Sequence, residues 1–249
     1  MKKSKKIIII NIISIILVGV LIYSGIKIYN WYKENKNSKK VVEQISETIT
    51  IQKNENEEQK QYIVDFNSLK EQNAETVAWI KVNNTNIEYP IVKTSNNSYY
   101  LTHSFNKSYN SAGWPFADYK NKFDGTDKNI VMYGHNRKDG SMFATLKSTL
   151  STEWYNNEEN RNIIFNTENE NSIYEVFSVY QIENEEYYIQ TEFETEEKFG
   201  KFIETIKKRS IKDFGVEVTS KDSILTLSTC ANNNKYRVVL HAKKVLSEK

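Results

Sequence analysis

The feature that most constrains this chain is an apolar run near its N-terminus. Residues 7–26 are apolar almost throughout, and the polar interruptions are Asn11, Ser14 and Ser24. A helix of about 20 apolar residues matches the thickness of a bilayer core. A removable signal peptide usually has a shorter apolar region and a small-residue cleavage site. The sequence therefore predicts an uncleaved membrane anchor over residues 7–28.

The residues that flank this run are typical of a membrane–water interface, but they do not show which end of the anchor lies inside the cell. Aromatic side chains follow it as an interfacial belt does, at Tyr23, Tyr29, Trp31 and Tyr32. Lysines lie on both sides of it, at Lys2, Lys3, Lys5, Lys6, Lys27, Lys33, Lys36, Lys39 and Lys40. Because both flanks are basic, the positive-inside rule does not orient the anchor.

Charge separates the two ends of the chain. Residues 1–40 hold nine lysines and one glutamate, a balance of +8, so the remaining residues carry −6 of the overall +2. An acidic folded part argues against binding to nucleic acid, which needs a basic face. The single cysteine excludes an internal disulfide. No metal-type Cys/His cluster or phosphate-binding glycine loop occurs, so no metal and no cofactor are expected.

The segment after the anchor is predicted to be helical before strands begin. Val41, Val42, Ile45 and Ile49 recur at helical spacing and predict a first amphipathic helix. The charged run over residues 54–60 is expected to be solvated. A second helix is expected to start at Phe66–Leu69, capped by Asn67 or Ser68, and to end before Val77.

From residue 77 onward the pattern favours a β-barrel. Short alternating runs separated by turn residues predict strands, at residues 77–82, 87–92, 99–101, 116–119, 162–165 and 173–182. Phe143 and Leu146 indicate a short helix. Residues 194–208 break the series with apolar side chains at positions 199, 202, 203 and 206, which predict an amphipathic helix capped by Thr195. That helix is either scaffold or, with the loop before it, one side of a substrate groove.

Two further strand-like stretches end in chemically active side chains. Residues 224–230 read Ile-Leu-Thr-Leu-Ser-Thr-Cys, and residues 236–241 form the next run, with Arg237 near its start. Residues 129–136 form another apolar run that leads into Gly134 and His135. Because side chains alternate along a strand, Cys230 shares a face with Ser228 and Thr226. Cys230 alone could be a small buried hydrophobe.

Together, cysteine, histidine and arginine fit nucleophilic acyl transfer. A thiolate attacks a carbonyl, and a nearby base or cation raises the thiolate fraction. The carbonyl oxygen then becomes an oxyanion that needs a donor. We therefore take His135, Cys230 and Arg237 as catalytic candidates. His103 and His241 are expected to be structural, and Arg137 is the first competitor of Arg237.

At these residues the sequence resembles the class B sortases, the cysteine transpeptidases of the Gram-positive cell wall. The resemblance covers roughly residues 62–246 and rests on Thr-Leu-Ser-Thr-Cys at 226–230, Arg-Val-Val at 237–239, Tyr-Gly-His-Asn at 133–136, Gly-Ser-Met-Phe at 140–143 and His-Ala-Lys at 241–243. Two features depart from the family pattern. The loop from Cys230 to Arg237 is short, and Gly-Trp-Pro-Phe at 113–116 replaces a more usual Gly-Ser-Ile-Phe-like run.

The resemblance implies an architecture and a cellular location. The expected fold is mainly β, a closed antiparallel sortase-type barrel with N-terminal helices and a helical insertion before the cysteine strand. The implied organisation is a cytoplasmic tail (1–6), a transmembrane anchor (7–28), a linker with the first helix (29–61) and a catalytic domain (62–249). The catalytic domain would lie outside the cell membrane, facing the wall.

The resemblance also implies a reaction and its partners. Cys230 would cleave a C-terminal sorting motif of secreted proteins after threonine, and an amine of a peptidoglycan precursor would accept the thioacyl group. It implies no metal, because no acidic cluster matches the calcium site of some class A sortases. Substrate-binding candidates are Asn97, Leu101, Tyr188, Ile189 and Ser228, although turn formation or packing would explain Asn97 and Leu101 equally well.

Three other functions fit the same residues. A cysteine peptidase that releases the peptide by hydrolysis would use the same catalytic groups, and so would a sortase that polymerises pilins. A non-catalytic adhesion module with an incidental thiol is a more distant alternative. The sequence does not specify the sorting motif, the acceptor amine, the choice between single anchoring and polymerisation, or the oligomeric state.

Overall fold

We describe the protein from a computed structural model. It describes residues 2–53, 60–231 and 235–248, and it gives the backbone alone for residues 2–5, 51–53, 60–61, 230–231 and 248. The chain forms two compact units, Met1–Lys40 and Val41–Lys249. Each unit is described separately below.

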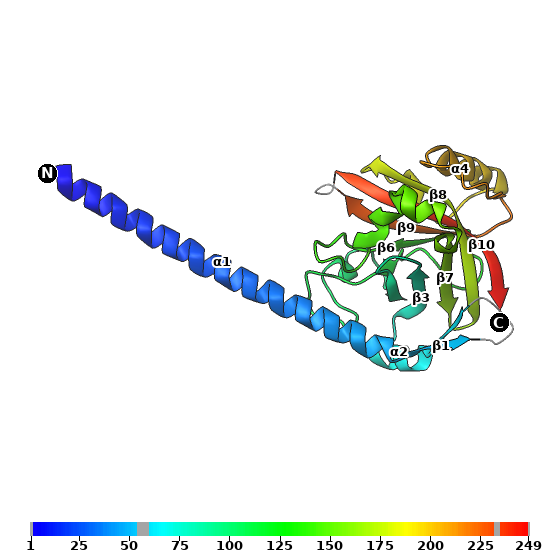
Figure 1. The fold of residues 1–249 in the computed structure, drawn as a ribbon, viewed down its shortest axis with the longest axis horizontal. Helices are drawn as coiled ribbons and strands as arrows, with labels where there is room; N and C mark the ends of the chain where they lie inside the picture. Colours follow the sequence, from blue (N-terminus) through cyan, green and yellow to red (C-terminus); the bar gives the residue numbers. More distant parts are fainter. Residues whose placement is uncertain (1, 54–59, 232–234, 249) are drawn as a thin grey trace. The chain divides into compact units, whose positions relative to one another are not determined.

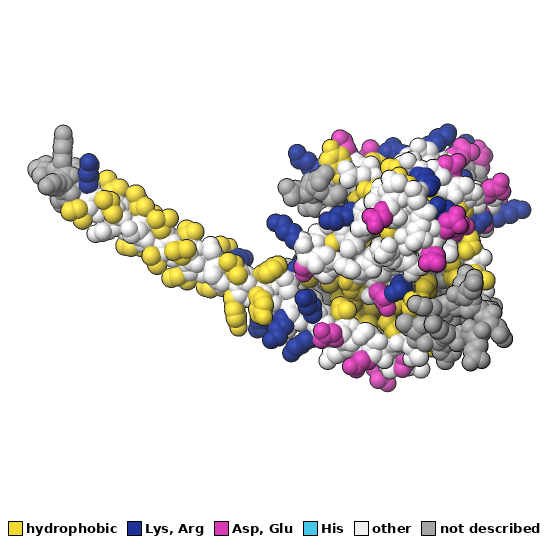
Figure 2. Space-filling model, in the orientation of Figure 1, with side chains coloured by type: hydrophobic (Ala, Val, Ile, Leu, Met, Phe, Trp, Pro, Cys, Tyr) yellow, Lys and Arg dark blue, Asp and Glu magenta, His cyan; other side chains and the backbone are white. Residues whose placement is uncertain are grey.

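The first unit is an uninterrupted stretch of helix. Helix α1 (Lys2–Ser46) contains it, and among the described helices α1 is the one long and apolar enough to cross a membrane. Figure 2 shows apolar side chains along this helix, and Ile15 and Leu21 are 71% and 70% exposed. Apolar surface of this extent is costly in water and favourable in lipid. One long apolar helix compatible with a membrane anchor is therefore present.

The second unit starts with the last turns of the same helix. The separate first helix predicted around Val41 is instead the C-terminal end of α1, which buries Val41 and Ile45 in the core of the second unit. Ile49, which the helical spacing had included, lies in strand β1 (Ile49–Lys53). Strand β1 pairs with β2 (Lys60–Val64) in a two-stranded sheet that the sequence analysis missed. Most of the charged run predicted to be solvated, residues 54–59, lies outside the described residues.

A second helix forms where it was expected, but its cap differs. Helix α2 spans Phe66–Gln72, and its N-cap is Asp65 rather than Asn67 or Ser68. The Asp65 carboxylate accepts hydrogen bonds from both the backbone N–H and the hydroxyl of Ser68. A carboxylate also suits the positive end of a helix dipole, so Asp65 is the better cap.

The rest of the second unit is built on a closed barrel, as predicted (Figure 1). Its described strands are β3 (Thr76–Val82), β4 (Glu88–Val92), β5 (Phe116–Ala117), β6 (Asn129–Tyr133), β7 (Asn162–Thr167), β8 (Glu170–Glu183), β9 (Ile224–Ala231) and β10 (Tyr236–Glu248). Their order around the barrel is β10-β8-β7-β3-β4-β5-β6-β9. Most neighbouring pairs are antiparallel as expected, whereas β4–β5 and β6–β9 are parallel.

Short helices fill several connections between the strands. They are η1 (Tyr99–Leu101), η2 (Ala144–Leu150), α3 (Thr152–Asn156), η3 (Glu158–Arg161), η4 (Tyr187–Ile189) and α4 (Glu196–Lys208). The strand predicted at residues 99–101 is therefore a 3₁₀ turn. The reason is local, because Asn96 Oδ1 accepts hydrogen bonds from the backbone N–H groups of Ser98 and Tyr99 and turns the chain.

The amphipathic helix before the cysteine strand forms as predicted. Thr195 caps α4 by accepting a hydrogen bond from the Lys198 N–H, and its buried side chains are Phe199, Phe202, Ile203 and Ile206. None of these four lines the groove described below. The helix therefore serves as scaffold, while the loop before it, residues 184–195, supplies groove residues.

Candidate active site

Three neighbouring strands bring the catalytic candidates to one end of the barrel. Strand β6 runs parallel to β9 with Tyr133 opposite Ser228, and β9 runs antiparallel to β10 with Cys230 opposite Arg237. His135 follows Tyr133 by two residues, as Cys230 follows Ser228. Directly opposed residues of an antiparallel pair lie about 4.5–5.5 Å apart. The backbone thus places His135, Cys230 and Arg237 side by side.

His135 is held by the loop that precedes β5. Its Nε2 lies 2.8 Å from the Leu101 carbonyl oxygen. A carbonyl only accepts, so Nε2 carries the hydrogen and Nδ1 is the nitrogen at which a proton can be exchanged. Gly113, at φ +62°, lies under the ring, and a Cβ there would stand 2.9 Å from His135 Cδ2 and 2.5 Å from the Tyr100 carbonyl oxygen.

The turn from β6 into His135 is clamped from two sides. A Cβ on Gly134 would lie 2.5 Å from the ring of Phe143, a residue that is itself fully buried. The Thr229 hydroxyl donates to the Gly134 carbonyl oxygen at 2.7 Å, and the Gly134 N–H donates to the Ser228 carbonyl oxygen at 3.3 Å. These contacts tie the histidine turn to the residues just before Cys230.

Arg237 is the arginine that lines the groove among the described residues. Its Nη1 donates to the Tyr236 carbonyl oxygen at 3.1 Å, and its side chain is half-buried. The competing arginines have other partners. Arg137 lies 3.6 Å from the Asp139 carboxylate, Arg161 pairs with Glu158, and Arg209 stacks 4.4 Å above the Tyr187 ring.

The end of the barrel that carries the catalytic candidates opens into a groove of about 390 Å³. We call it the substrate groove. It is lined by Asn97, Leu101, Phe116, Tyr133, Gly134, His135, Asn184, Glu185, Glu186, Tyr188, Ile189, Ser228, Thr229 and Arg237. Seven of the eight site residues predicted from the sequence are in this lining. The eighth is Cys230, whose backbone lies in β9 directly after Thr229 and opposite Arg237, and whose side chain lies outside the described atoms.

The loop after β8 forms one side of the substrate groove. Tyr188 is buried, and its hydroxyl lies 2.9 Å from the Ser228 hydroxyl. Ile189 is half-buried beside it. The Tyr188–Ser228 contact joins the loop to the cysteine strand two residues before Cys230.

A buried carboxylate that the sequence analysis missed holds two of the groove residues, Asn97 and Tyr133. Asp118 is 3% exposed, and one of its oxygens accepts from Asn97 Nδ2 at 2.8 Å and from the Tyr133 hydroxyl at 2.7 Å. Burial, followed by the Asp118 charge, raises the pKa of Tyr133, which keeps its hydroxyl protonated as a donor. A charged residue directly after the apolar pair Phe116–Ala117 was the available signal.

The rim of the substrate groove also carries two acidic side chains that sequence reasoning passed over. Glu185 and Glu186 are exposed and precede η4. Glu185 pairs with Arg209 at 3.4 Å. They lie in a run of charged and polar residues, which gave no reason to separate them from ordinary surface.

The other two histidines have structural surroundings, as expected. His103 stacks on Tyr99 with ring centroids 4.0 Å apart, and its Nδ1 lies 2.8 Å from the Tyr99 carbonyl oxygen. His241 is fully buried, away from the groove lining.

Comparisons with known proteins agree with this geometry. The sortase domain family matches residues 80–245. Sortase B of Listeria monocytogenes is 33% identical over 239 residues, which is 94% of this chain and 95% of that protein. A Bacillus anthracis protein described as similar to sortase B superposes with a TM-score of 0.73 at 34% identity, covering 88% of this chain and 98% of that one. A Staphylococcus aureus sortase B–substrate complex gives 0.68 at 32% identity, covering 72% and 84%.

The matched family model, residues 80–245, spans most of the barrel. Two independent kinds of similarity, in sequence and in structure, lead to the same group. The chain belongs to the sortase family and, within it, to the class B sortases, which are cysteine transpeptidases.

Proposed function

We propose that Cys230, His135 and Arg237 carry out acyl transfer from a sorting peptide bound in the substrate groove. His135 Nδ1 takes the proton of the Cys230 thiol. The thiolate so formed attacks the carbonyl carbon of a threonine, and Arg237 stabilises the oxyanion that develops on the carbonyl oxygen. When the C–N bond breaks, His135 gives a proton from Nδ1 to the leaving amine. A thioester between Cys230 and the threonine remains.

A second amine then releases the acyl group. The amine nitrogen attacks the thioester carbonyl, His135 takes its proton, and the Cys230 thiolate leaves as a new peptide bond forms. We propose an amine of a peptidoglycan precursor as this acceptor. Glu185 and Glu186 at the groove rim supply a negative field that attracts an ammonium group before it loses its proton.

The groove lining supports an extended peptide as the donor substrate. Its described lining combines apolar side chains, such as Leu101 and Ile189, with a few polar groups, as peptide and ligand grooves do. Asn97 is the polar group we assign to the peptide contact; its amide is held at both ends, by Asp118 and by the Tyr119 N–H. A structurally similar protein was solved as a sortase B–substrate complex.

We further propose that residues 7–28 anchor the enzyme as a single membrane pass. Residues 1–6 would then form a cytoplasmic tail, residues 29–61 a linker region, and residues 62–249 a catalytic domain outside the cell facing the wall. The exposed apolar side chains of α1 support the anchor. The outward orientation follows from the substrate, because cell-wall precursors are used on the outer side.

The observation that carries this proposal is the register that sets Arg237 opposite Cys230 on β10 and β9, with His135 at the end of β6. The test is product analysis with the full chain in detergent micelles, using a library of threonine-containing peptides. With an added glycyl peptide as amine, we expect a new amide joining the threonine carbonyl to that amine. Release of the free acid alone, at the same rate with and without amine, would instead identify a hydrolase.

A further inference from the structure

One continuous chain of hydrogen bonds, buried in its middle, holds both ends of the groove loop that carries Tyr188 and Ile189. It starts at Tyr187, crosses strands β8, β10, β9 and β6, and returns to the loop at Gln190. Its members, which we call the His241 chain, are Tyr187, Tyr180, His241, Thr226, Asn129 and Gln190. The two groove residues between its ends are thus bracketed by it.

The direction of each bond in the His241 chain follows from donor and acceptor counts. Thr226 donates its one hydroxyl hydrogen to Asn129 Oδ1 at 2.7 Å. The Thr226 hydroxyl oxygen therefore accepts the hydrogen bond from His241 Nδ1, which lies 2.8 Å away. His241 therefore carries its hydrogen on Nδ1. Its Nε2 accepts from the Tyr180 hydroxyl at 2.9 Å, and Tyr180 in turn accepts from Tyr187 at 3.1 Å.

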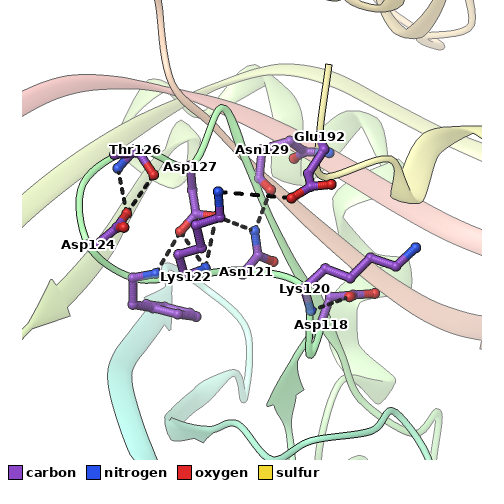
Figure 3. A network of polar contacts seen from close by, with 10 residues as sticks. Asp118, Lys120, Asn121, Lys122, Asp124, Thr126, Asp127, Asn129 and Glu192 are labelled. Carbon is purple, nitrogen blue, oxygen red and sulfur yellow. Dashed lines mark hydrogen bonds and ion pairs between the residues drawn. The ribbon is translucent and has the colours of Figure 1, made fainter. Parts of the chain in front are cut away.

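The far end of the His241 chain closes on the loop backbone. Asn129 Nδ2 donates to the Gln190 carbonyl oxygen at 2.8 Å. The backbone of Asn129 is held as well, because Asn121 Nδ2 donates to the backbone carbonyl oxygen of Asn129 at 2.7 Å and to the Asp127 carboxylate at 3.0 Å (Figure 3). Because the Gln190 carbonyl oxygen can only accept, the Asn129 amide must present Nδ2 to Gln190 and Oδ1 to Thr226.

The surroundings of His241 keep its ring in this one neutral tautomer. The ring is 0% exposed and lies against Phe177 and Phe202, with centroids 6.0 and 6.4 Å away. Burial lowers the pKa of His241 to about 3. The ring stays neutral at physiological pH, and a second proton would turn the Nε2 acceptor into a donor against the Tyr180 hydroxyl.

We propose that His241 is a positioning residue whose neutral Nδ1–H form, through the chain from Tyr187 to Gln190, presents Tyr188 and Ile189 to the bound peptide. This inference rests on the proposed function only in taking the bound molecule to be a peptide. The chain acts on the loop before substrate arrives, so its effect belongs to binding rather than to the chemical step.

The decisive variant is Thr226→Val, which keeps the shape of the side chain but removes the central hydroxyl. We expect the KM for the best-cleaved library peptide to rise roughly three- to tenfold, the size of one ordinary hydrogen bond, with kcat changed less than twofold. Amide hydrogen exchange at residues 187–190 should accelerate by a similar factor. Thr226→Ser restores the hydroxyl and should restore both values.

Matched controls separate positioning from general stability. Thr149 is equally buried, and its hydroxyl donates to the Leu146 carbonyl oxygen, so Thr149→Val should lower the unfolding midpoint without changing KM or exchange at 187–190. Tyr187→Phe should raise KM, whereas Tyr155→Phe should not. Tyr155 is half-buried and bonds its hydroxyl to Thr152.

The tautomer of His241 tests the proposal without any substrate. Nitrogen NMR of histidine-labelled full chain in detergent should show the hydrogen on Nδ1, with the signal assigned by its loss in His241→Gln. A hydrogen on Nε2, or unchanged exchange at 187–190 in Thr226→Val, would overturn the proposal. Because both measurements need no peptide, they decide it even if the proposed transpeptidation fails.

Discussion

At the scale of single residues, Arg237 allows charge and shape to be separated. Guanidinium offers several donors in one plane, whereas the lysine ammonium is a point charge. If Arg237 binds the oxyanion and the peptide backbone together, Arg237→Lys should fail nearly as badly as Arg237→Ala. We expect a loss of about 10²–10³ in kcat for both, measured as steady-state peptide turnover.

The alkylation rate of Cys230 by a small thiol reagent serves as the internal control, and it should remain within a few-fold of wild type because the thiol is untouched. Arg161→Lys is the matched control, since that half-buried side chain pairs with Glu158 and lies outside the groove lining. Near wild-type turnover in Arg237→Lys would show that charge suffices. Near wild-type turnover in Arg237→Ala would show that another residue stabilises the oxyanion, and Arg137 would be the first candidate to test.

Asp118 is the second residue whose role can be isolated. Asp118→Asn replaces one carboxylate oxygen with an NH₂ group that cannot accept from Asn97, Tyr133 or the Lys120 N–H. At least one buried donor is then unmatched, so we expect peptide KM to rise about three- to tenfold. Steady-state kinetics measures this.

The exposed Asp124, which accepts hydrogen bonds from Thr126, gives the matched control Asp124→Asn, which should leave KM unchanged. Equal KM in wild type and Asp118→Asn would show that the carboxylate does not orient the groove.

At the scale of elements, the sequence predicted the strands and helices whose hydrophobic pattern repeats over several residues. It missed the elements whose backbone is set by a local contact. The alternating strands and the stripe of α4 were found, because each repeats one period over several residues. The aromatic residues at 99–101 predicted a strand. The backbone instead forms a 3₁₀ turn, because Asn96 Oδ1 accepts hydrogen bonds from the N–H groups of Ser98 and Tyr99. The β1–β2 pair was missed because its strands flank a charged run without a hairpin turn signal.

The candidate site was predictable to a similar extent. Motifs at strand ends predicted His135 and Arg237, and the family resemblance predicted Asn97, Leu101, Tyr188, Ile189 and Ser228; the structure brings all of them into one groove lining. Asp118 and the His241 chain were not found, because their roles depend on contacts between residues far apart in sequence, such as Thr226 with Asn129. Hydrogen-bond partners of this kind leave no periodic signal.

Gly113 allows a test at the element scale, since the loop before β5 contacts His135, the proposed catalytic histidine. Gly113→Ala adds a Cβ that would clash with the Tyr100 carbonyl oxygen and the His135 ring, at a backbone φ of +62°. We expect His135 to shift and peptide turnover to fall at least tenfold, since misplacing a catalytic group by about 1 Å can cost 10²-fold.

Turnover and the unfolding midpoint are measured together. Gly125→Ala is the control, because Gly125 also has positive φ, at +87°, but a Cβ there meets nothing within 4 Å. If both variants lose stability equally and neither loses turnover beyond that, the loop does not position His135.

At the scale of the whole molecule, the anchor and the barrel are expected to be separable. The core of the second unit begins at Val41, so removing residues 1–30 leaves all its described buried apolar side chains in place. We expect that protein to be soluble without detergent, folded by circular dichroism and active on peptides.

A longer deletion through residue 46 supplies the comparison. It removes the buried Val41 and Ile45 and should lower the unfolding midpoint. Aggregation or unfolding of the 1–30 deletion itself would contradict the anchor assignment.

The central claim of the account is that Cys230 carries the acyl group. Intact mass spectrometry of the full chain, quenched in acid after mixing with peptide and no amine, tests it most directly. We predict an adduct with the mass of the peptide up to threonine, located on Cys230, absent from Cys230→Ala, and discharged by an added glycyl amine. An adduct on another residue, or substantial turnover by a folded Cys230→Ala variant, would contradict the account.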